Sequence, residues 1–582
     1  MFYCMVYFSF FLFFSIVCFL LGLLFISKNL LIFLEIGVLN LFGVSIEGVF
    51  FLDWKTFLFM SFVLFISSMI LNYSSEYMSG DKYIKRFIFL MVLFVCSMMM
   101  LILNLNLVSI LIGWDGLGLV SYALVIYYQN VKSNSAGMLT ALSNRIGDAA
   151  IILAISFSVH FGSFNFIFYL SWAQFDQNVE NFMKMVLLLI ILASMTKSAQ
   201  LPFSSWLPAA MAAPTPVSSL VHSSTLVTAG VYFLIRVSEA LSFAMMEFLL
   251  IISLLTMFMA GLAANFEYDL KKIIALSTLS QLGLMMTILS LGESNLAFMH
   301  LLIHALFKAL LFMCAGAIIH NFGDNQDIRN MGGLSSNLPL TSACMNISNF
   351  ALCGLPFLSG FYSKDLIAEA LSMQYSSMLV YLIFYLSIGL TVAYSIRLSY
   401  YIFWSESKFS SLSSFSDNNN WSMTKSMLGL VVLVVLMGSF YSWVFMDISY
   451  FIILPVYMKL STVFFIILGL ILGIELVQME FFYKNLYLEM KNISLFLVGM
   501  WNMPIISTMG ASKYALYVGK MYFLIFDQGW LEYYGSKGAF NIMSSLLSQI
   551  QYIFSSNHLK LFFLLFIIYF SGLLSYYFYM GL

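Results

Sequence analysis

Apolar residues in this chain form long runs that are separated by short polar stretches, glycines and prolines. A bilayer core about 30 Å thick is crossed by a helix of about 20 apolar residues, which is the typical length of these runs. Shorter segments with alternating apolar and polar residues would be expected of a β-barrel, so the pattern favours helices. We predict about fifteen membrane-spanning helices, near residues 3–26, 52–74, 84–105, 107–128, 136–158, 183–200, 214–237, 243–264, 270–290, 296–319, 338–372, 376–404, 427–448, 450–476 and 559–580.

Two of the predicted spans are associated with helix-breaking residues. Pro202 and Pro208 follow the sixth run, and Gly354, Pro356 and Gly360 interrupt the eleventh. Backbone that leaves the helix at membrane depth is tolerated only where it lines protein or a water-filled cavity. The expected fold is therefore an all-α polytopic membrane protein with two broken helices.

The stretch at 481–556 differs from the rest, because charged residues recur in it and no charge-free run is long enough to span a membrane. An amphipathic helix from Ser512 to Phe554 would contain about 43 residues and extend roughly 65 Å. The alternative is an irregular surface loop, since three glycines in the same stretch could break the helix.

Composition excludes a soluble protein. Of 582 residues, 62% are hydrophobic and 9% are charged, against about 25% charged in ordinary soluble domains. The net charge of −1 gives no basic surface for nucleic acid. The first 27 residues contain no Lys or Arg, so we interpret the first apolar run as a span and not as a cleavable targeting segment. The six cysteines show no CxxC spacing and are expected to pack as small apolar residues.

A few charged residues lie inside the predicted spans, where each costs at least about 2.5–3.5 kcal/mol and is a functional candidate. Asp115 lies in the fourth span. Arg145 and Asp148 are three residues apart in the fifth, so they fit a local salt bridge as well as a role in transport. Lys197 lies in the sixth span, just before the break at Pro202, and His222 lies in the seventh; neither has an ionic partner nearby in the sequence.

The tenth run carries three titratable residues on one helical face. At 100° per residue, His300, His304 and Lys308 lie at about 0°, 40° and 80° and rise about 12 Å. A metal site is disfavoured, because Lys308 would repel a cation and no acidic third ligand shares the face. A bis-histidine haem is disfavoured too, since its ligands approach from opposite sides. The remaining alternative is that each histidine is simply a buried core residue.

Lys364 and Asp365 follow the break in the eleventh run, and Glu369 lies one turn further on. Burial disfavours a charged lysine and a nearby carboxylate favours it, so a buried lysine with a movable partner can switch its proton affinity. Ordered along the chain, these groups predict a lateral proton wire. Passage of Na⁺ or K⁺ would require oxygen ligands, whereas the central candidates are nitrogen bases.

Seven motifs resemble the antiporter-like subunits of respiratory complex I. They match that family in order: GWDGLGLVSY (113–122), SNRIGD (143–148), TKSAQLPFSSWLP (196–208), PTPVSSLVH (214–222), DLKKIIALSTLSQ (269–281), HLLIHALFK (300–308) and LPFLSGFYSKD (355–365). The segment at 481–556 before a last span is similar to the lateral helix found in the same family. The resemblance implies N-terminal spans, an antiporter-like proton-translocating core, C-terminal spans, a lateral amphipathic segment and a final anchor, at 1–83, 84–405, 406–480, 481–556 and 557–582.

For the first part of the wire, the resemblance implies that Asp115 and Lys197 form a charge pair whose opening and closing sets the proton affinity of Lys197. His222 would relay protons to the centre. The family usually has Glu where this chain has Asp115. The shorter side chain reaches about 1.5 Å less far, which puts direct pairing with Lys197 in question.

For the second part, the resemblance implies that Lys308 is the central switch and that His300 and His304 hydrate or feed it. Lys364 and Asp365 would lead to the exit. Arg145, Asp148 and Glu369 would support the wire.

The resemblance also implies a place in a larger enzyme, a proton-translocating NADH:ubiquinone reductase of the mitochondrial inner membrane. NADH, FMN, iron–sulfur clusters and ubiquinone would be bound by other subunits, and this chain would bind no cofactor or metal. Its partners would be neighbouring antiporter-like subunits and lipids such as cardiolipin, with no nucleic acid. Two alternatives stay open at this point: a subunit of a stand-alone monovalent cation/proton antiporter, which shares most of these motifs, and a purely structural scaffold.

Overall fold

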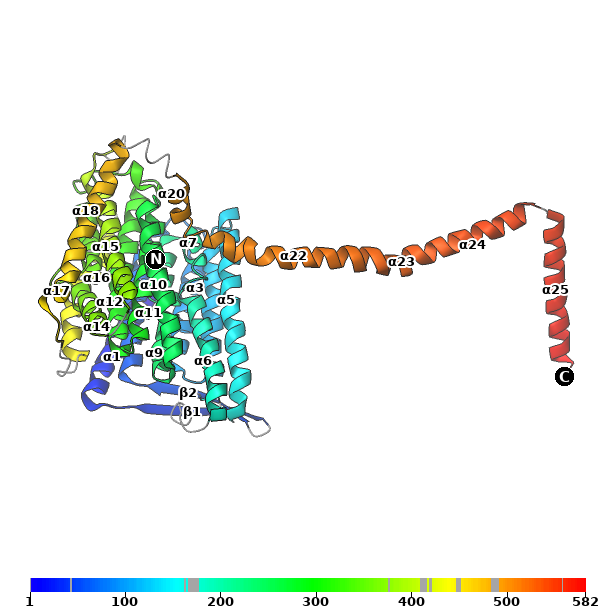
Figure 1. Ribbon diagram of the computed structural model, residues 1–582, viewed down its shortest axis with the longest axis horizontal. Helices are drawn as coiled ribbons and strands as arrows, with labels where there is room; N and C mark the ends of the chain where they lie inside the picture. The colour runs from blue at the N-terminus through cyan, green and yellow to red at the C-terminus, as the bar shows by residue number, and fades with distance from the viewer. Residues whose placement is uncertain are drawn as a thin grey trace. The chain divides into compact units, whose positions relative to one another are not determined.

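The structure, a computed structural model, describes residues 2–41, 44–161, 164–165, 177–374, 377–408, 416–417, 421–445, 452–482, 491–556 and 558–581. The chain forms two compact units, Met1–Ser507 and Thr508–Leu582. The first unit is a bundle of helices with one β-hairpin (Figure 1).

The first half of the bundle contains the hairpin and the first of the two broken regions. Its elements are α1 (Phe2–Lys28), β1 (Ile32–Leu41), β2 (Val44–Leu52), α2 (Trp54–Tyr77), α3 (Ile84–Leu103), α4 (Leu107–Val125), α5 (Val131–Ser158), η1 (Val159–Phe161), α6 (Gln177–Lys197), α7 (Trp206–Ala209), η4 (Ala210–Ala212), α8 (Thr215–Val221), α9 (Leu226–Val237) and η5 (Ser238–Ala240).

The second half contains the central helix and the second broken region. Its elements are α10 (Phe243–Phe266), α11 (Leu270–Ser290), α12 (Ser294–Asn321), η6 (Ile328–Asn330), α13 (Pro339–Cys353), α14 (Ser359–Met373), α15 (Met378–Ser399), η7 (Tyr400–Trp404), α16 (Trp421–Phe445), α17 (Val456–Lys459), α18 (Ser461–Phe482), α20 (Lys491–Val498) and α21 (Met503–Ile505). A π-helical turn, η10 (Ile506–Gly510), contains the boundary between the units.

The predicted fold class is confirmed. Among the described residues, twelve helices are long and apolar enough to cross a membrane, or up to thirteen if one bent helix pair is counted as a span. The predicted number of about fifteen included the eleventh run, at 338–372. That run forms two helices of 15 residues each, α13 and α14, and each is too short to cross a bilayer alone.

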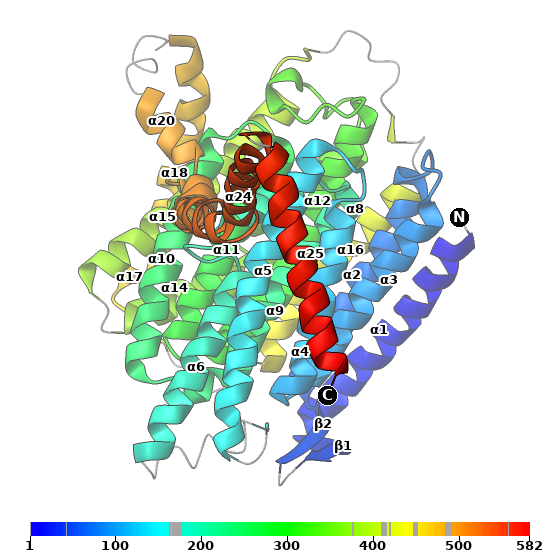
Figure 2. The same cartoon turned by 90° about the vertical axis from the view of Figure 1, so that its right-hand side faces the viewer.

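The hairpin was not predicted. β1 and β2 pair antiparallel from Ile32↔Leu52 to Leu41↔Val44, and the hairpin lies across one end of the helices (Figures 1 and 2). It is attached to the α3–α4 connection, where the Leu105 backbone N–H donates to the Val49 carbonyl at 3.2 Å. The segment is rich in β-branched and aromatic residues, which favour strands.

The core centres on α12, which is buried on every side from Leu296 to Ile319. It packs against α2, α8, α11, α13, α14 and α16. Any polar side chain on α12 is therefore enclosed by protein, and α11 is buried almost as completely.

Both broken regions surround this central helix. α13 ends at Gly354, whose φ of +81° is the left-handed conformation that glycine adopts without strain. A Cβ on Gly360 would lie 1.7 Å from the Ala351 carbonyl oxygen, so only glycine lets α14 start against the end of α13. The predicted break after α6 is also present, as the short segments α7, η4 and α8.

A further break, between α8 and α9, was missed by the sequence analysis. Three consecutive hydroxyl residues donate to helix carbonyls one turn back: Ser223 to Ser219, Ser224 to Leu220 and Thr225 to Leu220. Side-chain hydroxyls that bond to the backbone in this way compete with the helical ladder. His222 lies at this break.

The second unit, considered by itself, is helical nearly throughout. It contains α22 (Ala511–Tyr522), the π-helical η11 (Phe523–Leu531), α23 (Glu532–Tyr534), α24 (Ser536–Ser556) and α25 (His558–Met580). The helix predicted from Ser512 to Phe554 lies within this series. Its glycines are accommodated by the π-helical stretch and by a local kink at Gly535, where φ is −90° and ψ is −119°.

Candidate functional site

The histidines of α12 lie one above the other, as the sequence predicts. The His300 and His304 ring centroids are 6.3 Å apart. His300 Nδ1 is hydrogen-bonded to Ser363 Oγ of α14 at 2.9 Å, and its Nε2 to Gln281 Oε1 of α11 at 3.2 Å. Because Ser363 immediately precedes Lys364, this bond joins the central helix to the second broken region.

His304 is fully buried, and neither ring nitrogen has a hydrogen-bond partner among the described residues. Its ring contacts Phe307 edge-on, with centroids 5.4 Å apart. Buried polar atoms are nearly always satisfied in proteins, so an imidazole held without a protein partner beside Lys308 is not explained by packing alone.

Lys308 is fully buried, and its Nζ donates to Ser277 Oγ of α11 at 2.5 Å. No carboxylate forms an ion pair with it within the described ranges. Burying a charge without a counter-ion is costly, so the ammonium form of Lys308 depends on small changes in the surrounding groups. The alternative that the titratable residues on this helix face are simply buried core residues is therefore disfavoured.

Lys364 uses the break between α13 and α14. Its Nζ donates to Thr391 Oγ1 of α15 at 2.7 Å and to the Leu352 carbonyl at 3.4 Å. The last carbonyls of a helix lack intrahelical partners and carry a partial negative charge. The end of α13 therefore supplies an acceptor for the Lys364 ammonium, which forms no ion pair with a carboxylate among the described residues.

Asp365 and Glu369 do not join this site. Asp365 is partly buried, and the cation that acts on it electrostatically is Lys459 of α17. Glu369 is buried one turn further along α14. Residues that are adjacent in a helix point about 100° apart, so Lys364 and Asp365 face different neighbours.

The expected pair of Asp115 and Lys197 is not formed. Lys197 is fully buried, its Nζ donates to the Trp114 carbonyl at 3.1 Å, and it lies 5.1 Å from the centre of the Trp114 ring. Asp115 instead accepts from Arg145 Nη1 at 2.6 Å. The short aspartate side chain, one methylene less than glutamate, is held on the Arg145 side.

Arg145 also bonds to Asp148 at 3.1 Å, so the predicted pair within α5 is confirmed and extended to a triad with Asp115. The triad opens laterally: the side chains of Arg145 and Asp115 are 49% and 34% exposed in the isolated chain. Both residues lie far from the ends of α4 and α5. Charges in such positions normally face other protein or water and not lipid.

His222 is buried, and neither ring nitrogen has a partner among the residues that the structure describes. Its ring is 6.2 Å from that of Trp206. Trp206 Nε1 in turn donates to the Thr196 carbonyl, next to Lys197, at 3.0 Å. The indole therefore contacts both the His222 ring and the backbone of the residue that precedes Lys197.

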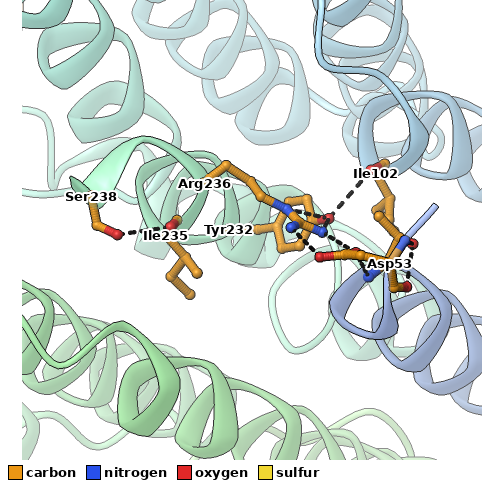
Figure 3. Close-up of polar contacts among 7 residues, drawn as sticks. Asp53, Ile102, Tyr232, Ile235, Arg236 and Ser238 are labelled. Atoms are coloured by element: carbon orange, nitrogen blue, oxygen red, sulfur yellow. Dashed lines mark hydrogen bonds and ion pairs between the residues drawn. The ribbon is translucent and has the colours of Figure 1, made fainter. Parts of the chain in front are cut away.

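One buried ion pair was not singled out from the sequence (Figure 3). Arg236 of α9 donates to both oxygens of Asp53, from Nη1 at 2.6 Å and from Nη2 at 2.8 Å, and to the Tyr232 hydroxyl from Nε at 2.9 Å. Asp53 also caps α2, accepting from the Thr56 N–H at 2.8 Å. Burial opposes the charge of Asp53, which lies just before α2, but the ion pair and hydrogen bonds with Arg236 hold its pKa below the ordinary value.

We name Asp53, Tyr232 and Arg236 the α2–α9 clasp. It ties the start of α2 to the end of the helix that follows His222. The sequence contains a partial indication of this ion pair, since both charged residues lie at the ends of apolar runs. No local sequence pattern, however, predicts that two residues 183 positions apart form a pair. No group of three or more His, Cys, Asp or Glu that could hold a metal occurs within the described ranges.

Three family models match the chain. Residues 39–88 match "NADH-Ubiquinone oxidoreductase (complex I), chain 5 N-terminus", residues 104–391 match "NADH:quinone oxidoreductase/Mrp antiporter, TM", and residues 394–577 match "NADH dehydrogenase subunit 5 C-terminus".

Curated relatives with the name "NADH-ubiquinone oxidoreductase chain 5" are similar over nearly their whole length. The Anopheles gambiae protein is 53% identical over 573 residues, which is 98% of both chains. The Aedes aegypti protein is 53% identical over 564 residues, 97% of this chain and 96% of the relative. The Lumbricus terrestris protein is 45% identical over 512 residues, 87% of each.

Two solved structures share the fold. The first, the Mrp complex from Dietzia sp. DQ12-45-1b, has a TM-score of 0.72 and 24% identity, over 87% of this chain and 56% of that one. The second, an archaeal membrane-bound sulfane sulfur reductase, has a TM-score of 0.62 and 22% identity, over 70% of this chain and 68% of that one.

Proposed function

Because this chain belongs to the NADH-ubiquinone oxidoreductase chain 5 family, we propose that its buried basic residues carry protons through the membrane arm of respiratory complex I. The chain is a multi-pass, proton-translocating subunit of that oxidoreductase. NADH, FMN, iron–sulfur clusters and ubiquinone are held by other subunits in this proposal, and the insect relatives support a location in the mitochondrial inner membrane.

The observation that carries the proposal is the line of buried basic side chains through the centre of the bundle. In chain order they are Lys197, His222, Lys308 and Lys364; each is buried, and the His300–Ser363 bond joins α12 to the residue that precedes Lys364. Its lysine and histidine nitrogens are hydrogen-bonded to serine and threonine hydroxyls, to the Gln281 amide oxygen and to backbone carbonyls, and its titratable groups are nitrogen bases. A path for Na⁺ or K⁺ would be lined mainly by oxygen ligands.

In this mechanism the central lysine is the switch. When a charge approaches Lys308, the balance between its amine and ammonium forms changes, because burial leaves little other compensation. His304 and His300 accept or supply the proton on one side. The neighbouring proton-carrying residues are Lys197, which is hydrogen-bonded to the Trp114 carbonyl, and Lys364, which is hydrogen-bonded to a carbonyl at the end of α13.

Asp115 acts indirectly in this arrangement. It is paired with Arg145, and a change in that pair alters the field at Lys197 without a direct bond. Asp148 supports the pair. Asp365 and Glu369 lie beyond Lys364, and we keep them as the exit side of the path.

The lateral opening of the Arg145 triad supports a protein partner on that face. We propose that this partner is a neighbouring antiporter-like subunit, since the family works in membrane-arm assemblies. Lipids such as cardiolipin would surround the contact. The lateral segment at 481–556 braces that contact. We also propose that the chain is organised into N-terminal spans, a proton-translocating core, C-terminal spans, a lateral segment and a final anchor, with boundaries after residues 83, 405, 480 and 556.

A variant of the central lysine tests the function. Lys308→Met in assembled complex I, reconstituted in liposomes, is expected to abolish NADH-driven proton uptake while NADH oxidation by ferricyanide, a reaction of the peripheral arm, continues. Lys425→Met is the matched control, because Lys425 is exposed on α16 beside Trp421. Undiminished pumping by an assembled Lys308→Met complex would refute the proposal.

The stand-alone cation/proton antiporter remains the second candidate, favoured by the structural similarity to the Mrp complex. The match of residues 394–577 to a chain 5 C-terminus and the full-length relatives favour complex I. Sodium movement that requires this chain, without NADH oxidation, would favour the antiporter.

A further inference from the structure

A cavity with both charged and apolar lining residues opens at one end of the first unit, away from the residues of the proposed wire. It has a volume of about 710 Å³, far above the roughly 10–15 Å³ that one water requires. It is bordered by the α4–α5 connection, α7 and η4, the α10–α11 connection, the end of α12, and α20 with α21. Its charged lining residues are Lys132, Glu267, Asp269, Lys271, Lys272 and Asp324.

Two adjacent lysines of this cavity differ sharply. Lys272 is ion-paired on the rim, with its Nζ 2.9 Å from Asp269 and 4.0 Å from Glu267. Lys271 is only 6% exposed, and its Nζ donates to the Ala213 carbonyl at 3.4 Å. Within the described ranges Lys271 has no ion-pair partner.

Lys271 is also unfavourably placed for helix stability. It is the second residue of α11, where the partial positive charge of the helix N-terminus disfavours a cation. The charged groups that act on it from other elements are Asp324, after α12, and Lys132, on α5. A buried amine in this position, at a cavity lined in part by charged residues, suits a group that gains and loses a proton.

Two segments of the chain lead from Lys271 toward the buried basic residues. Its acceptor, Ala213, directly precedes Pro214 and α8, which rises about 11 Å to His222. Along α11, Ser277 and Gln281 lie about 9 and 15 Å further on. These two residues hold Lys308 and His300.

We propose that this cavity is the vestibule through which the buried line exchanges protons with the aqueous phase, and that Lys271 is the proton-transferring residue at its floor. A hydronium ion in the vestibule gives a proton to the Lys271 amine and becomes water, and the resulting ammonium passes the proton inward to the His222 and Lys308 regions and returns to the neutral amine. The inference rests on the proposed function, because it needs a proton path to feed.

Chemical rescue tests the role of the amine. Lys271→Cys in assembled complex I is expected to lower NADH-driven proton pumping at least 10-fold, a modest value for loss of a proton-transfer group. Treatment with 2-aminoethyl methanethiosulfonate attaches a titratable amine to the new thiol and is expected to restore pumping. The trimethylammonium reagent restores only the charge, which cannot transfer a proton, and is expected to leave pumping low.

The controls separate accessibility from function. Lys272→Cys is expected to pump within 2-fold of the unmodified protein. Thr278→Cys, fully buried further along α11, should resist the trimethylammonium reagent while Lys271→Cys reacts, as followed by peptide mass spectrometry. The unmodified complex treated with each reagent corrects for other cysteines.

Each outcome decides a different claim. Normal pumping by Lys271→Cys, with Lys308→Met inactive, overturns the vestibule and leaves the proposed function intact. Equal rescue by both reagents overturns proton transfer by Lys271 and shows that only its charge matters. Normal pumping by both variants overturns the proposed function itself.

Discussion

Removing one side of the α2–α9 clasp gives the largest stability effect that we expect from a single charged residue in the bundle. The side chains of Arg236 and Asp53 are 10% and 6% exposed. Breaking a buried pair costs about 3–5 kcal/mol, because the remaining charge is left without compensation. Asp53→Asn isolates this term, since Asn caps a helix about as well as Asp.

The predicted shift in melting temperature follows from the size of the unit. At about 2.1 cal/mol/K per residue, a unit of about 500 residues has an unfolding entropy near 1 kcal/mol/K. A loss of 3–5 kcal/mol therefore lowers the midpoint by roughly 3–5 °C for either Asp53→Asn or Arg236→Met.

Site-resolved alkylation measures this shift within the assembled complex. Cys314 is buried on α12, so its thiol reacts with iodoacetamide only after this chain opens, and the modified peptide is quantified against temperature. The double variant removes both charges and should cost clearly less than the sum of the single variants. Additive losses, or single shifts below 1 °C, would contradict a stabilising role for the buried pair.

Two further predictions follow from the same geometry. Because the pKa of Asp53 is lowered in the folded protein, the stability that the clasp contributes is fully present above its ordinary pKa of 3.8 and is lost as the pH falls below it; melting curves against pH should show this loss, and Asp53→Asn should flatten it. Gly230→Val places a Cβ 2.7 Å from the Ser194 carbonyl oxygen and 3.3 Å from the Lys197 side chain, so we expect a loss of about 1–3 kcal/mol and weaker pumping; Gly572→Val, with no atom within 4 Å of its Cβ, should change neither.

The sequence predicts well what one continuous helix determines. His300, His304 and Lys308 share a face because the helical period is fixed, and the structure places them as that period requires. The break at Gly354 is equally local, since a left-handed residue ends a helix wherever it occurs.

Contacts between distant segments were not predictable in the same way. The distance from Asp115 to Lys197 depends on how α4, α5 and α6 pack, and Arg145 proved to be the nearer partner. The α2–α9 clasp depends on tertiary packing as well. The hairpin is not predicted by apolar run length, because that length does not specify whether two neighbouring segments pair as strands.

The exposed Arg145 triad has a consequence for how the cell handles newly made copies of the chain. A copy that has inserted into the bilayer without its neighbour must keep Arg145 and Asp115 solvated at the edge of the bundle, which thins or wets the lipid beside α5. In such a copy the exposed charges distinguish the unassembled chain from the assembled one, and docking of the neighbouring subunit covers them. Surplus chain should therefore be short-lived, and its steady-state amount should follow the supply of its partner.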